Sequence, residues 1–170
     1  MPLIAKDRLA SLTLTATGKA RYAGRDTNER FGLEQAAAEA RLEENAHAIN
    51  SLQDRLYAEG RRALLVVLQG IDTAGKDGTI RKVFNHTGPL GVSVTAFRQP
   101  STEELAHDYL WRAHLAMPRR GTIGIFNRSH YEDVLIARVR KFAKPEVIEE
   151  RYRQICDFER MLAENGTVIL

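Results

Sequence analysis

The fold is decided by residues 63–79, ALLVVLQGIDTAGKDGT. They begin with an unbroken apolar run, residues 63–68, which is typical of a parallel strand buried on both faces. A glycine-rich turn follows, and Lys76 opens a stretch that we expect to be helical as far as Asn85. Strand, glycine loop and helix in this order predict a phosphate-binding loop, because backbone N–H groups and the positive end of the helix then face phosphate oxygens.

The loop has the glycine and lysine spacing of a Walker A motif, but two acidic residues depart from the usual pattern. Asp77 follows the lysine, where P-loop enzymes place the Ser or Thr that binds Mg²⁺. Asp72 puts a carboxylate inside the loop, where it requires a cation or a proton. Asp72 could bind Mg²⁺, accept a proton, or simply cap the following turn. The phosphate contacts predicted from this segment are Gly70, Thr73, Ala74, Gly75, Lys76, Asp77, Gly78 and Thr79.

The rest of the chain alternates predicted strands and helices. We expect strands at residues 92–97, 122–126 and 167–170, and helices at residues 33–59, 101–117, 129–139 and 145–165. This order predicts an α/β fold: a P-loop kinase-like, three-layer α/β/α domain with a mostly parallel sheet and an N-terminal helical arm. We place the arm at residues 1–32 and the domain at residues 33–170. Because an apolar strand needs a covering helix, we expect the natural protein to continue past the last strand.

Polar residues follow the third predicted strand, at the edge where open α/β sheets place their ligands. Arg128 can bind phosphate through both arms of its guanidinium group, and Asp133 could help to hold Mg²⁺. Asn127 and Glu132 could contact the acceptor nucleotide. The alternative for the two acidic residues is an ordinary charged helix surface.

Two further arginines are phosphate-binding candidates. Arg98 ends the second predicted strand, and Arg112 lies in the predicted helix at residues 101–117. Either could equally be a solvated or ion-paired surface arginine.

Composition and charge limit the class of protein. The chain is 44% hydrophobic and 28% charged, with no apolar run long enough to span a bilayer and no secretory signal, so we expect a cytoplasmic protein without membrane or nucleic-acid partners. Residues 61–144 carry twice as many Lys and Arg as Asp and Glu, which suits a polyanionic partner. A stripe of Leu42, Ile49, Leu52 and Leu56 would allow self-association, and we expect a homo-oligomer.

Four segments resemble the polyphosphate kinase 2 family: LLVVLQGIDTAGKDGTIRKVF, FRQPSTEELAHDYLWR, IGIFNRSHYEDVLIARV and, more weakly, ICDFERMLAENG. They cover roughly residues 50–170, and NRSHYED is similar to the family's class III branch. The resemblance implies an enzyme that transfers a phosphoryl group reversibly between inorganic polyphosphate and nucleoside mono- or diphosphates, with Mg²⁺ and adenine or guanine nucleotides. The family's catalytic residues fall on Asp72, Lys76, Arg128 and Asp133, its metal ligands on Asp72 and Asp133, and its nucleotide contacts on Asn127 and Glu132.

The chain departs from the family pattern in three places. Ile71 and Thr73 stand where the family commonly has Arg and Ala, and Arg98 stands where a lysine is more usual. The family's C-terminal lid, which carries phosphate-binding arginines, does not occur in these 170 residues. Two other functions stay open from the residues: an ATP-dependent kinase of nucleotides or small molecules, and a non-catalytic module that binds nucleotide or polyphosphate.

Overall fold

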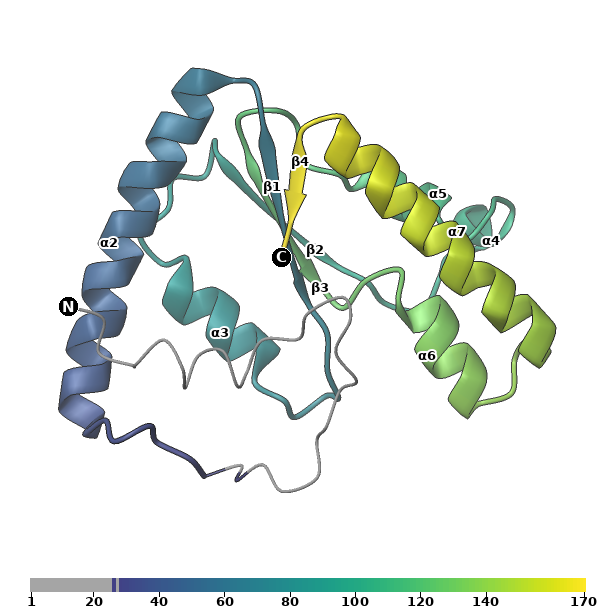
Figure 1. Ribbon diagram of the computed structural model, residues 1–170, viewed down its shortest axis with the longest axis horizontal. Helices are drawn as coiled ribbons and strands as arrows, with labels where there is room; N and C mark the ends of the chain where they lie inside the picture. Colours follow the sequence, from purple (N-terminus) through teal and green to yellow (C-terminus); the bar gives the residue numbers. More distant parts are fainter. Residues whose placement is uncertain (1–25, 27) are drawn as a thin grey trace. The chain divides into compact units, whose positions relative to one another are not determined.

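The computed structural model describes residue 26 and residues 28–170 (Figure 1). The arm predicted at residues 1–32 lies mostly outside the described residues, and its limit at residue 32 stays a prediction. The chain divides into two compact units, residues 1–43 and 44–170, and the division falls inside the long helix α2 (Gln35–Glu59). This helix confirms the one predicted at residues 33–59. The second unit contains every element that positions the candidate site.

A sheet of four parallel strands forms the middle of the second unit, in the order β2-β3-β1-β4. The strands are β1 (Ala63–Leu68), β2 (Val92–Ala96), β3 (Ile123–Asn127) and β4 (Thr167–Ile169). Leu68 and Ala96 both pair with Asn127, so three strands end in line. The carboxyl ends of β1, β2 and β3 therefore share one edge of the sheet, and the predicted parallel α/β sheet is confirmed.

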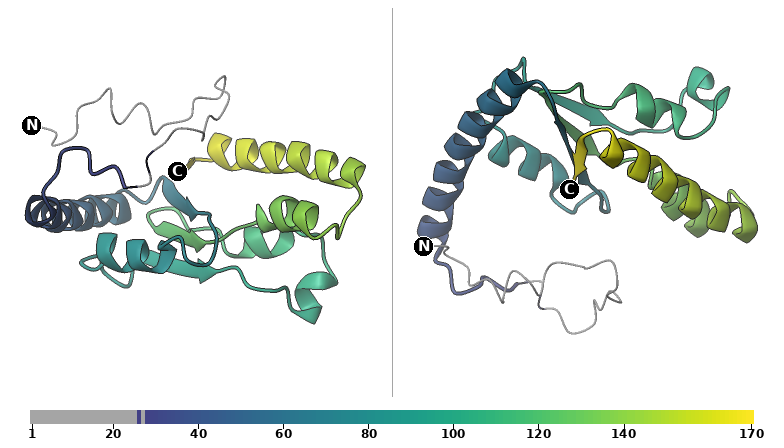
Figure 2. Two further views of the ribbon diagram at one scale, coloured as in Figure 1. Left: turned by 90° about the horizontal axis from the view of Figure 1, so that it is seen from below. Right: turned by 45° about the horizontal axis from the view of Figure 1, so that its top comes forward.

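Helices cover both faces of this sheet. Helix α3 (Lys76–Val83) lies on one side, and α6 (Glu132–Val139) and α7 (Pro145–Glu164) lie on the other (Figures 1 and 2). The chain leaves β1 toward β2 through α3, but leaves β3 toward β4 through α6 and α7. Strands β1 and β3 are neighbours, but the chain leaves them toward opposite edges of the sheet. Open α/β sheets bind ligands at such a switch point.

The core lies between the sheet and the helices α5 (Trp111–Leu115) and α7. Strand β3 is buried along its length up to Phe126, as expected of a strand with neighbours on both sides and helices on both faces. The main cluster unites Leu65, Phe97, Ala113, Phe126, Phe158 and Leu162. A second cluster of Val134, Ile148 and Ile155 joins α6 to α7. The buried positions of α7 repeat at helical spacing, so this helix is fixed against the sheet by one apolar stripe.

The single helix predicted at residues 101–117 is wrong: the structure has two short helices, α4 (Thr102–Leu105) and α5 (Trp111–Leu115). The predicted capping box is confirmed, since Glu104 N–H donates to Ser101 Oγ at 3.2 Å and Ser101 N–H donates to the Glu104 carboxylate at 2.7 Å. The helix then stops at a turn in which Asp108 Oδ1 accepts from Leu110 N–H at 2.9 Å. Such side-chain bonds compete with helical ones.

The two long helices each have an extensive polar face. Most of the predicted stripe on α2 lies on its less exposed face: Leu42, Ile49 and Leu56 are half-buried and alternate with the buried Ala46 and Gln53, whereas Leu52 is 59% exposed. Self-association through this stripe stays a prediction. Among the described residues, no helix combines the length and the apolar character needed to cross a membrane.

Candidate active site

The glycine loop connects β1 to α3, as predicted. Gly75 caps α3 with φ 84°, a left-handed conformation in which any side chain would be strained. Thr79 is used within the helix, where its hydroxyl donates to Gly75 O at 3.1 Å. The Lys76 ammonium group donates to Gly70 O at 2.9 Å and to Ile71 O at 2.7 Å. It therefore lies against the loop backbone, and one of its three N–H groups is not used by these carbonyls.

The unexpected acid of the loop has a cation beside it. Asp72 forms an ion pair with the guanidinium group of Arg128, which comes from the segment after β3. The Asp72 side chain is 82% exposed and that of Arg128 is 33% exposed. The Arg128 N–H donates to Leu68 O at 2.9 Å, so its backbone is attached to the end of β1. The pair thus connects the two sides of the switch point and leaves the carboxylate accessible to solvent.

A pocket of about 610 Å³ opens at the carboxyl ends of β1, β2 and β3. Each strand is followed by one basic side chain in the lining: Lys76, Arg98 and Arg128. Three cations beside a glycine loop favour a ligand that carries several anionic groups. The complete lining is Asp72, Thr73, Gly75, Lys76, Asp77, Gly78, Ala96, Phe97, Arg98, Gln99, Asn127 and Arg128.

Asn127 and Asp77 join the two walls of this pocket. The Asn127 side-chain amide donates to the Asp77 carboxylate. Asp77 lies in the first turn of α3, where the helix dipole favours a negative charge. Together with Asp72, these side chains supply the oxygen donors that a divalent cation such as Mg²⁺ prefers. The donor set of the pocket therefore fits a hard metal ion.

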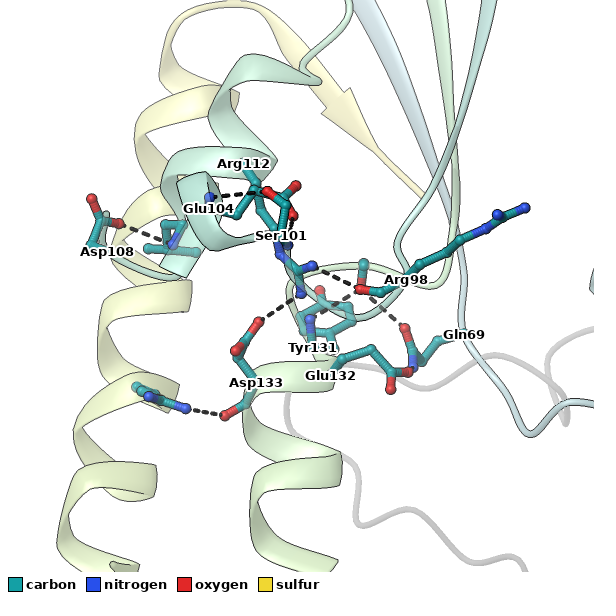
Figure 3. Close-up of polar contacts among 12 residues, drawn as sticks. Gln69, Arg98, Ser101, Glu104, Asp108, Arg112, Tyr131, Glu132 and Asp133 are labelled. Carbon is teal, nitrogen blue, oxygen red and sulfur yellow. Dashed lines mark hydrogen bonds and ion pairs between the residues drawn. The ribbon is translucent and has the colours of Figure 1, made fainter. Parts of the chain in front are cut away.

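Arg112 and Asp133 form a largely buried ion pair (Figure 3), and neither residue lines the pocket. Their nearest atoms, Arg112 Nη2 and Asp133 Oδ2, are 3.3 Å apart. Arg112 Nη1 also donates to Arg98 O at 2.9 Å, and Arg151 Nη1 donates to Asp133 O at 2.7 Å. Burial raises the pKa of the Asp133 carboxyl group, and the charge of Arg112 opposes this effect. Each of the two side chains therefore has a partner within the fold. Phosphate binding by Arg112 and metal binding by Asp133 stay predictions.

Gln69, which the sequence analysis did not select, connects the glycine loop to the start of α6. Its amide nitrogen donates to the Glu132 carboxylate, and its oxygen accepts from Ser129 Oγ at 3.1 Å (Figure 3). Glu132 does not line the pocket, so its contact with a nucleotide also stays a prediction. A polar residue directly between an apolar strand and the first glycine was the signal available for Gln69.

Glu159 is the second residue that the sequence analysis did not select. It lies on α7 and accepts hydrogen bonds from His130 Nε2, at 3.2 Å, and from the Tyr131 hydroxyl group. His130 is only 1% exposed. No local signal marks Glu159, because it follows His130 by 29 residues on an ordinary amphipathic helix.

The structure thus divides the predicted site residues into three groups. The pocket unites Asp72, Thr73, Gly75, Lys76, Asp77, Gly78, Arg98, Asn127 and Arg128. The second group, Gly70, Ala74 and Thr79, belongs to the loop and the first turn of α3 but does not line the pocket. The third group, Arg112, Glu132 and Asp133, lies outside both the loop and the pocket lining.

Comparison with known proteins gives a consistent result. The family model described as polyphosphate kinase 2 (PPK2) matches residues 32–170. An AMP/ADP-polyphosphate phosphotransferase of Meiothermus ruber is 53% identical over 145 residues, which cover 85% of this chain and 54% of the relative. An ADP-polyphosphate phosphotransferase of Rhodopseudomonas palustris is 41% identical over 145 residues, covering 76% of this chain and 49% of the relative. The chain therefore spans about half the length of these relatives.

A solved structure agrees with these sequence matches. The crystal structure of polyphosphate kinase 2 from Arthrobacter aurescens superimposes with a TM-score of 0.88 and 40% sequence identity. The superposition covers 94% of this chain and 58% of that one.

Proposed function

Because the chain belongs to the polyphosphate kinase 2 family, we propose that this protein transfers a terminal phosphoryl group between inorganic polyphosphate and nucleoside mono- or diphosphates. In one direction AMP becomes ADP and ADP becomes ATP, and the reaction is reversible. The observation that carries the proposal is the pocket, in which Lys76, Arg98 and Arg128 converge on the glycine loop. A linear polymer of phosphates and a nucleotide tail present the anionic groups that such a pocket favours.

The reaction is an in-line displacement at phosphorus. A terminal phosphate oxygen of the nucleotide attacks the last phosphorus of polyphosphate, the P–O bond to the next phosphate breaks, and the shortened polymer leaves with the bonding electrons. Lys76 and Arg128 stabilise the negative charge on the oxygens of the transferred group, while the N–H groups at the start of α3 orient the phosphates. Asp72 holds the Arg128 guanidinium group beside the loop.

We propose Mg²⁺ as the metal and Asp72 as its first protein ligand. Asp72 lines the pocket, its carboxylate is largely exposed, and the oxygens of Asp77 and Asn127 lie in the same lining. Asp133 stays the predicted second ligand. When bound, the metal supplies positive charge to the phosphate oxygens and so favours the transfer.

A substrate assay tests the proposal against its alternatives. The full natural protein is incubated with Mg²⁺, AMP or ADP, and either polyphosphate or ATP as donor, and new nucleotide phosphates are separated by chromatography. Polyphosphate-dependent formation of ADP and ATP supports the proposal. Transfer from ATP alone would identify an ATP-dependent kinase, which the absence of Ser or Thr after Lys76 disfavours. Binding of polyphosphate without any transfer would identify a non-catalytic module.

The remaining expectations on partners are also proposals. Adenine and guanine nucleotides are the proposed acceptors, with Asn127 in the pocket lining as their nearest candidate contact. We place the protein in the cytoplasm, where nucleotides are available, and expect a homo-oligomer joined through the α2 stripe, of which Leu52 is the exposed member. Light scattering of the wild type and of Leu52→Glu tests that stripe, since a charge there should dissociate an oligomer held by it.

A further inference from the structure

The four residues 128–131, between β3 and α6, carry the arginine of the pocket in a strained conformation. Arg128 has φ 60°, a left-handed conformation that costs free energy for any residue with a side chain. Strain of this kind persists only where the surrounding structure holds it. We call residues 128–131 the arginine turn, and its position determines where the guanidinium group of Arg128 lies.

The arginine turn is held from the β1 side by two hydrogen bonds, and a third bond lies within the turn. Arg128 N–H donates to Leu68 O at 2.9 Å, and Ser129 Oγ donates to Gln69 Oε1 at 3.1 Å. Ser129 Oγ also accepts from Tyr131 N–H at 3.1 Å. Ser129 is completely buried. These bonds fix the first half of the turn to the strand that precedes the glycine loop.

The second half of the turn is held from the opposite side by one residue of α7. Glu159 accepts a hydrogen bond from His130 Nε2 and another from the Tyr131 hydroxyl group. The His130 ring also packs edge-on against Phe158, with 5.7 Å between centroids. Within the described part of the chain, the buried His130 Nδ1 has no hydrogen-bond partner, so Glu159 is the group that pairs with this ring.

The electrostatics favour an ionised Glu159. Burial acts to raise the pKa of the Glu159 carboxyl group, but the hydrogen bonds from His130 and Tyr131 outweigh it and lower this pKa. An ionised carboxylate only accepts hydrogen bonds, so it suits two donors. Both donors reach the same atom, Glu159 Oε1, so a glutamine could accept from them only through a neutral amide oxygen, which makes weaker hydrogen bonds than a carboxylate.

We infer that Glu159 is a positioning residue, which holds His130 and Tyr131 and thereby keeps Arg128 directed at Asp72 and the pocket. The inference rests on the proposed function, because it assigns Glu159 a part in phosphoryl transfer through Arg128. Glu159 itself does not line the pocket. It acts through the turn that it holds, from 31 residues away along the chain. Asp157 lies on the same helix but, among the described residues, pairs with Arg153 and Arg160 of α7 and not with the turn.

The test compares Glu159→Gln with Asp157→Asn in the full natural protein. Both changes remove one negative charge from α7, but only the first removes the charge from the residue that holds the arginine turn. Steady-state kinetics with ADP and polyphosphate are measured well below the melting temperature of each variant. We expect kcat of Glu159→Gln to fall about 10- to 100-fold with little change in KM, because a small displacement of a catalytic group acts mainly on the transition state. Asp157→Asn should keep the wild-type kcat.

A double-mutant cycle separates positioning from a general structural effect. In an Arg128→Lys background the forked guanidinium group is already lost, so adding Glu159→Gln should lower kcat much less than it does in the wild type. Equal falls in both backgrounds, or a wild-type kcat for Glu159→Gln, would overturn the inference. If Glu159→Gln does not fold, Glu159→Asp, which keeps the charge, carries the same cycle. Without turnover in the wild type and in Asp157→Asn, the proposed function itself fails and the inference fails with it.

Discussion

The glycine loop and the segment after β3 reach the same pocket in different ways. The loop, residues 70–75, and the adjacent Lys76 are neighbours in the sequence, and they contribute residues to one stretch of the pocket lining. The segment, residues 127–133, sends its side chains to different partners: Arg128 to the loop, His130 to α7 and Asp133 to Arg112. A contiguous motif can therefore place two residues, Asn127 and Arg128, in the pocket lining and direct others to partners elsewhere in the fold.

The largest effect is expected from Lys76→Ala, which removes a cation from the loop without removing a core contact. We expect turnover to fall by about 10³-fold or more, since loss of a charge-stabilising donor costs two to three orders of magnitude even for a neutral group. Lys82→Ala, an exposed change on the same helix, is the matched control. The measurement is polyphosphate-dependent ATP formation, with circular dichroism to verify folding. Normal turnover in a folded Lys76→Ala variant would show that the Lys76 side chain is not needed for phosphoryl transfer.

Arg112→Met should act on the fold instead, because it leaves the largely buried Asp133 carboxylate without the cation that pairs with it. Breaking a buried ion pair costs about 3–5 kcal/mol, and urea unfolding measures this directly. The control is Arg138→Met, which breaks the exposed pair with Glu149 and should cost less than about 1 kcal/mol. Equal midpoints for the two variants would show that the Arg112–Asp133 pair is not a structural element of the segment.

A smaller effect is expected from the pH dependence of the Glu159 contacts. The folded pKa of Glu159 lies below its ordinary value of 4.5, so its stabilising contribution is complete above that pH and is lost as pH falls through the folded pKa. The unfolding free energies of the wild type and Glu159→Gln should differ by about 1–2 kcal/mol near neutral pH. This difference should shrink below 4.5. A difference that grows on acidification would reverse the assignment of Glu159 as the ionised partner.

The smallest effect, on stability, tests whether the loop requires a glycine because of backbone strain or because of lack of space. An alanine Cβ at Gly75 or at Gly78 would meet no atom within 4 Å, but only Gly75 has a left-handed φ, 84°. We expect Gly75→Ala to lose about 1 kcal/mol of stability and Gly78→Ala, inside the helix, to lose none. Thermal unfolding of the pair provides the test. Similar losses for both would show that the loop conformation is not what requires a glycine.

Most of the fold could be predicted from the sequence because its elements have strong local signals. The apolar run at β1, the glycine loop and the Pro145 start of α7 each depend on neighbouring residues, and all three are confirmed. The prediction of a single helix at residues 101–117 is wrong for a local reason: the Asp108 side chain accepts a hydrogen bond from the backbone N–H of Leu110, at the turn that separates α4 from α5. The strand order could not be read from the chain, because sheet neighbours are chosen by packing between distant segments.

The sequence alone determined the unit of strand, glycine loop and helix from which we predict phosphate binding, since glycine spacing, a lysine and a helix start act through the backbone of a few consecutive residues. It also identified Arg98, Asn127 and Arg128, because residues after parallel strands meet at one edge. Only the tertiary structure decided that Asp133 faces Arg112 and that Glu159 pairs with His130. The direction of a side chain depends on the groups that packing brings beside it. Those groups come from elements far apart in the sequence, so their spacing along the chain does not predict the contact.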